Sequence, residues 1–379
     1  MMRPSFRLAI HRFPLAEPEL LFFAETMKRT VFLGTYTKGE SKGIYSCRFD
    51  DATGVLSDLR LAAETPSPSF LALHTTGKFL YAVNETESFE GTASGSVTAY
   101  RITDSDRGTL EKLNTVSSHG AHPCHLVVTP ESESIIIANY TGSTVTAIEI
   151  LDDGSLGKPL NKIVHEGSSI LKPRQSEPHP HAVNLDPANK FVFVSDLGMD
   201  QIIRYELEKG GRLSEPRGST AVSPGAGPRH FAFHPKGSFG YLLNEISRTI
   251  TAFRYDQPSG RLVEIQTIST VPDGWSRGST AEIFVHPGGR FLYASNRGHD
   301  SIACFHIHQG CGKLSLVDIE KTGGRTPRNF NLDPSGKWII AANQSSGDLH
   351  VLAINQKTGA LDPAGGRLEI PNPVCVVFL

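Results

Sequence analysis

Short apolar segments bounded by turn residues recur along the chain, and they fall into groups of four. In each group the first segment follows a loop rich in glycine and proline, as in PSPSFLALHTTG, PHPHAVNLDPAN and RTPRNFNLDPSG. Successive copies start 46 to 57 residues apart, a period typical of propeller blades. The equivalent first positions are Pro68, Pro123, Pro180, Pro228, Thr280, Pro327 and Pro373.

The other segments of each group also have the length and composition of β-strands. Six of the first segments are followed by a second apolar run such as FLYAVN, but the copy at residues 373–379 is not. A run of the missing kind, TVFLGTY, lies at residues 30–36. We therefore predict an all-β fold, a seven-bladed β-propeller with four-stranded blades, in which the segments at 30–36 and 373–379 pair and close the ring.

The repeats show no internal boundary, so residues 27–379 are predicted to form one propeller domain. Residues 168–178, SSILKPRQSEP, lengthen one connection between blades and are expected to form a loop at the rim. Residues 1–26 lie outside the repeats. They carry scattered arginines but no clean signal peptide, and we expect them to be an appended leader without a stable fold.

Charge and cysteine content narrow the function. The 37 basic and 39 acidic side chains give a net charge of −2, so neither nucleic acid nor an anionic membrane is an expected partner. The five cysteines are widely spaced and form no CxxC motif, which argues against a disulfide framework or a zinc site and favours a reducing, cytoplasmic location. No apolar run reaches the length of a membrane-spanning helix.

The repeat also indicates where a ligand site would lie. Because the first two strands of each blade form an antiparallel hairpin, the start of the first and the end of the second meet at one mouth of the central channel. Polar residues that differ between repeats at these positions are candidates for a small-ligand site. They are the cations Arg229, Arg297 and Arg328, the carboxylates Glu85, Asp196, Glu245 and Glu282, and the imidazoles His125, His179, His181 and His230.

Other polar positions have a structural interpretation. The asparagine that ends most second strands is expected to cap the hairpin, and His234 and His286 replace aspartate as turn residues. Glu85 and Glu282 could equally pair with neighbouring arginines, and His230 could face the blade. No metal site is expected, since His179 and His181 alternate along a strand and point to opposite faces. The sequence contains no nucleophile elbow, P-loop or dinucleotide fingerprint.

Three segments carry a resemblance to a known family: GPRHFAFHPKGSFGYLLNE, STAEIFVHPGGRFLYASNRGHDSIA and TPRNFNLDPSG. Over residues 28–379 the chain resembles the seven-bladed lactonase family, which includes bacterial propeller-type 6-phosphogluconolactonases and fungal carboxymuconate cyclases. The resemblance implies reaction at a lactone, foremost hydrolysis of 6-phospho-D-glucono-1,5-lactone in the pentose phosphate pathway. It also implies that His181, Arg229, Glu245 and Arg297, which match the residues implicated in the cyclase branch, are catalytic.

These residues permit lactone hydrolysis without a metal or other cofactor. Glu245 or His181 could deprotonate water, and Arg229 could stabilise the tetrahedral oxyanion. Arg297 and Arg328 are suited to hold a phosphate or carboxylate. His125, His179, His230 and Glu282 complete the predicted substrate-binding set.

Two alternatives remain open at this point. A muconate-lactonising cycloisomerase would use the same base and the same arginines. A non-catalytic propeller would bind a small anionic ligand or a protein on this face, although such modules usually display apolar and aromatic anchors, and Tyr140 is the one aromatic residue among these mouth positions.

Overall fold

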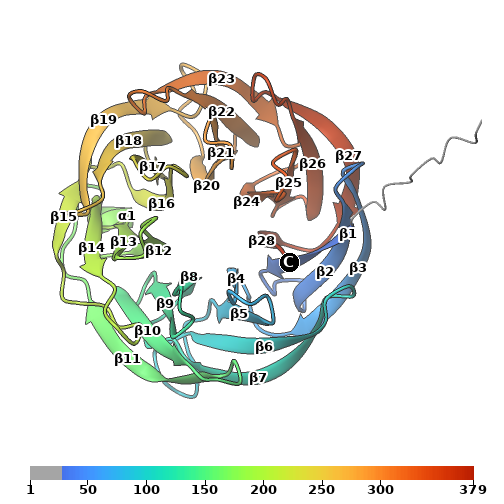
Figure 1. The fold of residues 1–379 in the computed structure, drawn as a ribbon, viewed down its shortest axis with the longest axis vertical. Helices are drawn as coiled ribbons and strands as arrows, with labels where there is room; N and C mark the ends of the chain where they lie inside the picture. The colour runs from blue at the N-terminus through green and yellow to red at the C-terminus, as the bar shows by residue number, and fades with distance from the viewer. Residues whose placement is uncertain (1–27) are drawn as a thin grey trace, which may run out of the picture.

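The computed structural model describes residues 28–379, which form a ring of seven antiparallel, four-stranded sheets (Figure 1). This confirms the predicted propeller. The predicted leader, residues 1–26, lies outside the described residues. Each sheet is one blade, and its strands run in order from the central channel to the outer wall.

The blades are numbered here along the chain. Blade 1 comprises β4 (Leu71–Leu73), β5 (Phe79–Asn84), β6 (Ser96–Asp104) and β7 (Thr109–Ser117). Blade 2 comprises β8 (Pro123–Val128), β9 (Ser134–Asn139), β10 (Thr144–Ile150) and β11 (Leu156–Val164). Blade 3 comprises β12 (Pro180–Leu185), β13 (Phe191–Asp196), β14 (Gln201–Glu206) and β15 (Gly218–Ala221). Blade 4 comprises β16 (Pro228–Phe233), β17 (Phe239–Asn244), β18 (Thr249–Asp256) and β19 (Arg261–Ser269).

Blade 5 comprises β20 (Ser279–Val285), β21 (Phe291–Arg297), β22 (Ser301–Ile307) and β23 (Leu314–Lys321). Blade 6 comprises β24 (Pro327–Leu332), β25 (Trp338–Asn343), β26 (Asp348–Ile354) and β27 (Leu361–Glu369). Blade 7 comprises β28 (Pro373–Phe378), β1 (Lys28–Thr35), β2 (Gly43–Asp50) and β3 (Val55–Glu64).

The ring closes as predicted, because β28 pairs antiparallel with β1 in blade 7. Val31 lies opposite Phe378, and Leu33 lies opposite Val376. The innermost strand of this blade therefore comes from the C-terminal segment and the other three from the N-terminal one, as Figure 1 shows where the red and blue ends of the ribbon meet.

Apolar side chains fill the spaces between neighbouring blades. In the cluster between blades 4 and 5, Leu243 and Ala252 pack against Leu292 and Phe305. Equivalent clusters occupy the other six interfaces. Buried tyrosines of β5, β17 and β21 add a hydrogen bond to a turn carbonyl of the next blade, so three of the interfaces are specifically aligned as well as apolar. The bonds join Tyr81 to Gly154, Tyr241 to Gly312, and Tyr293 to Gly359.

The polar side chains at turns and hairpin ends make the structural hydrogen bonds that the sequence predicts. The Asn84 Nδ2 donates to the carbonyl of Pro66 at 2.8 Å, which confirms the capping role of this asparagine. Asp186 accepts the backbone N–H groups of its turn, and His234 takes the same place in blade 4. The His234 ring also bonds to the carbonyl of Gly289 in the next blade, at 2.8 Å.

Two elements differ from the predicted repeat. The first strand of blade 1 is only three residues long. In blade 3 the repeat predicts a fourth strand at residues 210–214, GGRLS, but none forms there, because Gly210 and Gly211 both adopt positive φ and turn the chain back, leaving a single bridge between Leu207 and Leu213. β15 supplies the fourth strand instead.

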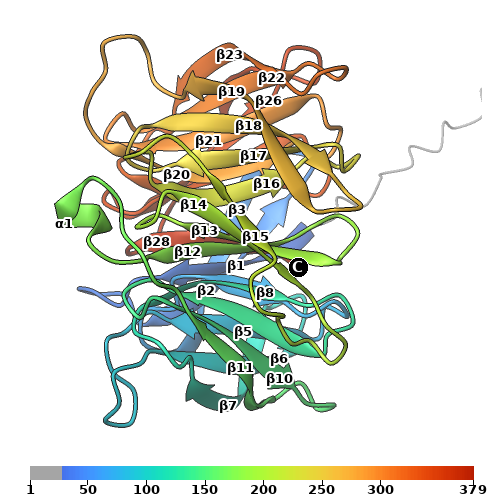
Figure 2. The ribbon, with the colours of Figure 1, turned by 90° about the vertical axis from the view of Figure 1, so that its left-hand side faces the viewer.

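The insertion at 168–178 lies at the rim, as predicted. It contains a single turn of helix, α1 (Lys172–Gln175), and projects from one face of the ring (Figure 2). This is the face on which the first strands begin and the second strands end.

Candidate active site

A pocket of about 360 Å³ opens at this face of the channel. The starts of first strands contribute Cys124, His181, Ser279 and Arg328, and the ends of second strands contribute Glu85, Tyr140, Glu245 and Arg297. Arg174 of α1 completes the lining. The predicted convergence of strand ends at one mouth is therefore confirmed, and the pocket is lined mainly by polar groups.

Glu245 is the centre of the charge arrangement in this pocket. Its Oε2 lies 2.9 Å from both Arg229 Nε and Arg297 Nη2, and its Oε1 lies 2.6 Å from Arg174 Nη2. The Arg229 side chain is 3% exposed and that of Arg297 is 13% exposed, whereas that of Arg174 is 44% exposed. Glu245 thus orients two buried cations and one cation at the rim.

These cations decide the ionisation of Glu245. Burial raises the pKa of this carboxyl, but Arg297 and Arg229 outweigh burial and hold the pKa well below its usual range. Glu245 is therefore an ionised acceptor at neutral pH whose oxygens already receive three guanidinium donors.

His181 lies beside this cluster, but its side chain is uncharged. Burial, reinforced by the positive charge of Arg229, lowers the pKa of the imidazole well below its usual value, so the ring is neutral at neutral pH. Among the described residues its ring nitrogens have one hydrogen-bonding neighbour, the Cys124 thiol, 3.9 Å from Nδ1. The ring therefore keeps a nitrogen lone pair available.

A small cavity of about 20 Å³ lies beneath the mouth pocket. The two share Glu85, Cys124, His181 and Arg328 as lining residues. A cavity of this size has room for about one water molecule when polar groups surround it, and here they include Arg229, His230 and Glu282.

A hydrogen-bonded chain continues below this cavity. Arg229 Nη1 donates to His230 Nε2 at 2.9 Å, and His230 Nδ1 lies 2.6 Å from Glu282 Oε1. Burial lowers the pKa of His230, so a neutral ring accepts from Arg229 and donates to Glu282. Burial raises the pKa of Glu282 to about 7. Asn329 Nδ2 donates to the second oxygen of Glu282 at 2.6 Å.

The remaining predicted binding residues divide between inside and outside the mouth pocket. Arg328 lines it and donates to the Tyr36 hydroxyl at 2.9 Å, which in turn donates to Glu85. His125 instead packs on Phe70 deeper in the channel.

His179, His230 and Glu282 are also absent from the lining of the mouth pocket. The His179 ring stacks on Tyr140, with ring centroids 4.3 Å apart. His230 and Glu282 line the small cavity and the opposite opening of the channel.

Several residues of the site were not among the predicted candidates, including Cys124 and Ser279 of the pocket lining as well as Tyr36 and Arg174. Tyr36 is the last residue of the segment 30–36 recognised as closing the ring and directly follows β1. Arg174 lies in the rim insertion, outside the repeat, so its position could not be inferred from the other blades. The only feature of the sequence that pointed to Arg174 was its place in a proline-containing insertion on the face of the site.

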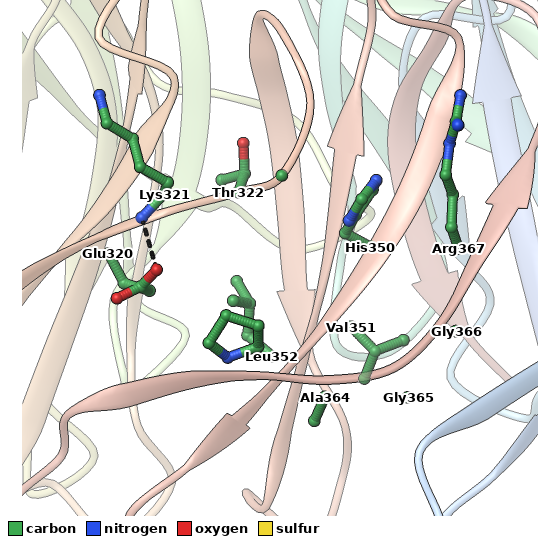
Figure 3. A pocket seen from close by; sticks show the side chains of 12 residues that line it. Glu320, Lys321, Thr322, His350, Val351, Leu352, Ala364, Gly365, Gly366 and Arg367 are labelled. Carbon is green, nitrogen blue, oxygen red and sulfur yellow. Dashed lines mark hydrogen bonds between the residues drawn. The ribbon is translucent and has the colours of Figure 1, made fainter.

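Figure 3 shows a second hollow, of about 440 Å³, on the outer wall between blades 5 and 6. It is lined by outer strands and loops, including Thr322, His350 and Arg367. Arg367 is engaged with Asp348 at 3.0 Å. The hollow lacks the convergent charges of the channel mouth.

Within residues 28–379, no three His, Cys, Asp or Glu side chains are grouped closely enough to hold a metal ion. None of the helices in this part of the chain is long and apolar enough to cross a membrane.

Comparison with known proteins gives consistent matches over this architecture. The family model described as lactonase, seven-bladed β-propeller, matches residues 30–378. A 6-phosphogluconolactonase of Bacillus subtilis is 38% identical over 349 residues, covering 92% of this chain and 97% of the relative. One of Formosa agariphila is 33% identical over 346 residues, covering 90% and 96%. The structure of a periplasmic gluconolactonase of Pseudomonas aeruginosa superimposes with a TM-score of 0.87 at 30% identity, covering 93% and 99%.

Proposed function

Because this chain belongs to the lactonase family of seven-bladed β-propellers, we propose that it hydrolyses 6-phospho-D-glucono-1,5-lactone to 6-phosphogluconate. The family membership confirms the resemblance noted in the sequence. Relatives named 6-phosphogluconolactonase support this substrate, and the arginine-lined mouth pocket supports an anionic one.

His181 acts as the general base in this proposal. It takes a proton from a water molecule as the water oxygen attacks the lactone carbonyl carbon. When the tetrahedral intermediate collapses, the ring C–O bond breaks and the imidazolium returns the proton to the leaving oxygen, which becomes a hydroxyl. No metal or other cofactor takes part in this sequence of steps.

Arg229 and Arg297 stabilise the oxyanion. Within the described residues, Arg229 Nη2 and Arg297 Nη1 have no protein acceptor, whereas their other nitrogens bond to Glu245, His230 or backbone carbonyls. Preorganised donors of this kind stabilise charge that develops in the transition state. Glu245 is a positioning residue here, since it holds the arginines in place.

The observation that carries this proposal is the position of His181. The neutral ring lines both the mouth pocket, which can take a sugar lactone, and the small cavity beneath it, which can take a water molecule. Glu245 lies in the same pocket, but its oxygens already accept from three arginines.

The test is an assay of purified protein with 6-phosphogluconolactone, corrected for spontaneous hydrolysis. We expect ring opening well above the spontaneous rate, and a rate equal to the spontaneous one would refute the proposal. A parallel assay with a carboxymuconate tests the cyclase alternative.

We also propose that the reaction takes place in the cytoplasm as a step of the pentose phosphate pathway. Five cysteines without a disulfide, four of them buried, are consistent with a reducing compartment. Fractionation of cells that express the full chain tests the location.

A further inference from the structure

Arg174 differs from the other cations of the mouth pocket in both origin and exposure. It comes from the rim insertion rather than from a blade strand, and its side chain is nearly half exposed. The other two arginines of the pocket lining, Arg297 and Arg328, belong to blade strands and are less exposed. Arg174 is therefore the cation that a ligand entering the pocket meets at the outer edge.

The insertion holds Arg174 in place by contacts that do not involve the arginine side chain. The neighbouring Gln175 is fully buried, and its Nε2 donates to the carbonyl of Leu197 at 2.9 Å. Ser169 donates to Asp200 Oδ2 at 2.5 Å, and Asp200 also accepts from the backbone of Gly225 and Gly227. An exposed guanidinium is thus carried on a firmly anchored segment.

The guanidinium also has unused bonding capacity. Its Nη2 contacts Glu245 and the Tyr140 hydroxyl, but its Nε and Nη1 have no acceptor among residues 28–379. Glu245 keeps Arg229 and Arg297 if Arg174 turns away. Arg174 can therefore exchange one contact for a bidentate contact with a ligand anion while Glu245 remains paired.

Substrate chemistry matches this arrangement. In the proposed substrate the reacting carbonyl is at C1, and the phosphate is carried by C6, an exocyclic carbon attached to C5 that rotates freely outside the ring. With C1 at His181, rotation about the C5–C6 bond allows the phosphate to reach the outer edge of the same pocket, where Arg174 lies. A phosphate dianion is costly to desolvate, so a half-exposed arginine can bind it while water still reaches it.

We propose that Arg174 is the phosphate-recognising residue of this site and sets the preference for a phosphorylated over an unphosphorylated lactone. The inference rests on the proposed function for the substrate. It places the phosphate at the rim insertion rather than at Arg297, whose Nε and Nη2 are occupied by Glu245 and the carbonyl of Thr280, so that only Nη1 remains and no bidentate contact is available.

The test compares 6-phosphogluconolactone with glucono-1,5-lactone. Arg174→Ala is expected to lower the ratio of their kcat/KM values by roughly 10- to 100-fold, the loss typical of one charge-assisted contact, with the change residing in KM for the phosphorylated lactone. The ratio of kcat/KM values for Arg174→Lys should lie between those of Arg174→Ala and the wild type. Arg217→Ala is the matched control, because Arg217 is also half exposed and ion-paired, with Glu206 at 3.3 Å, but is not in the lining of the mouth pocket.

A ratio unchanged in Arg174→Ala, or lowered equally in Arg217→Ala, would overturn the inference while lactone hydrolysis stands. If the wild type hydrolyses neither lactone, the proposed function fails, and calorimetry with 6-phosphogluconate and gluconate then decides the inference. Binding of 6-phosphogluconate weakened at least tenfold by Arg174→Ala, with gluconate affected less, supports the phosphate site. Equal losses for both ligands refute it.

Discussion

Glu245 and His181 face the same pocket, but both oxygens of Glu245 are hydrogen-bonded to arginines and the ring nitrogens of His181 are not. Glu245 accepts from three arginines. The only hydrogen-bonding neighbour of the His181 ring among the described residues is a weakly interacting thiol. A general base must accept a proton during the reaction, so the residue with the free lone pair is the better candidate.

Substitution separates the two roles. His181→Asn should lower kcat by about 100- to 10,000-fold with little change in melting temperature, because a general base is lost and no ion pair is broken. Glu245→Gln should instead destabilise the fold by about 3 kcal/mol, since it leaves buried arginines without their counter-charge. Steady-state kinetics and thermal unfolding measure both effects.

The pH profile of kcat is a further check on this assignment. Burial lowers the pKa of His181, so its base form should persist below pH 6.5 and the acidic loss of activity should occur below that pH. The opposite result would identify Glu245 as the base. In that case the Glu245→Gln variant would keep the stability of the wild type, have a much lower kcat and show no loss of activity at acidic pH.

Glu282 should make stability depend on pH. Burial raises the pKa of its carboxyl to about 7, so the folded state holds the proton more tightly than the unfolded state. The stability from this protonation is complete below the ordinary pKa of 4.5 and is lost as pH rises through about 7, a total of about 3 kcal/mol. The melting temperature of Glu282→Gln minus that of the wild type should therefore rise between pH 4.5 and 7 and then level off.

A difference that does not vary with pH would show that Glu282 ionises normally. The variant is compared with the wild type at each pH, so a constant effect of the amide on packing cancels.

At the scale of the element, the pair β28 and β1 carries the closure of the ring. Without β28, the inner edge of β1 would expose unpaired backbone groups and the apolar contacts of blade 7 with blades 6 and 1 would be lost. Closure therefore depends on a strand only six residues long.

Deleting residues 373–379 should unfold the domain, whereas deleting residues 1–26 should leave its melting temperature nearly unchanged. Circular dichroism during heating measures both. Equal melting of the two truncations would contradict the closure by strand pairing.

A point variant tests the pairing of β28 with β1 in a protein that still folds. A Cβ at Gly34 would lie 2.3 Å from the carbonyl oxygen of Pro68 and 3.0 Å from the Cβ of Cys375. Gly34→Ala should therefore cost about 1–3 kcal/mol through overpacking. Gly310→Ala is the control, because a Cβ there meets no atom within 4 Å.

At the scale of the whole molecule, the packed interfaces between blades protect Cys47, Cys304 and Cys375, whereas Cys124 is buried beside the mouth pocket. Cys47, Cys124, Cys304 and Cys375 are buried, and Cys311 is exposed. Burial also raises the pKa values of the buried thiols, which lowers their reactivity.

Ellman's reagent should therefore titrate one thiol in the native protein and five in denaturant. Cys311→Ser should reduce the native count to zero. Reaction of Cys47, Cys304 or Cys375 in the native protein within the time of the assay would show that neighbouring blades separate readily.

The repeat, the seven blades, the closing strand and the mouth where strand ends converge could all be predicted from the sequence. These features follow from local rules, because strand periodicity and turn residues recur in every copy and antiparallel pairing brings fixed positions together. The asparagine caps and the turn residues His234 and His286 were recognisable for the same reason.

Which of the candidate side chains contact one another depends on the tertiary packing. This packing directs His179 onto Tyr140 and His125 into the lower channel, and it brings Arg174 from outside the repeat onto Glu245. These contacts depend on side chains of different blades and on an insertion, and no periodic pattern encodes them. The balance between burial and charge that ionises Glu245 and keeps His181 neutral arises from the same long-range packing.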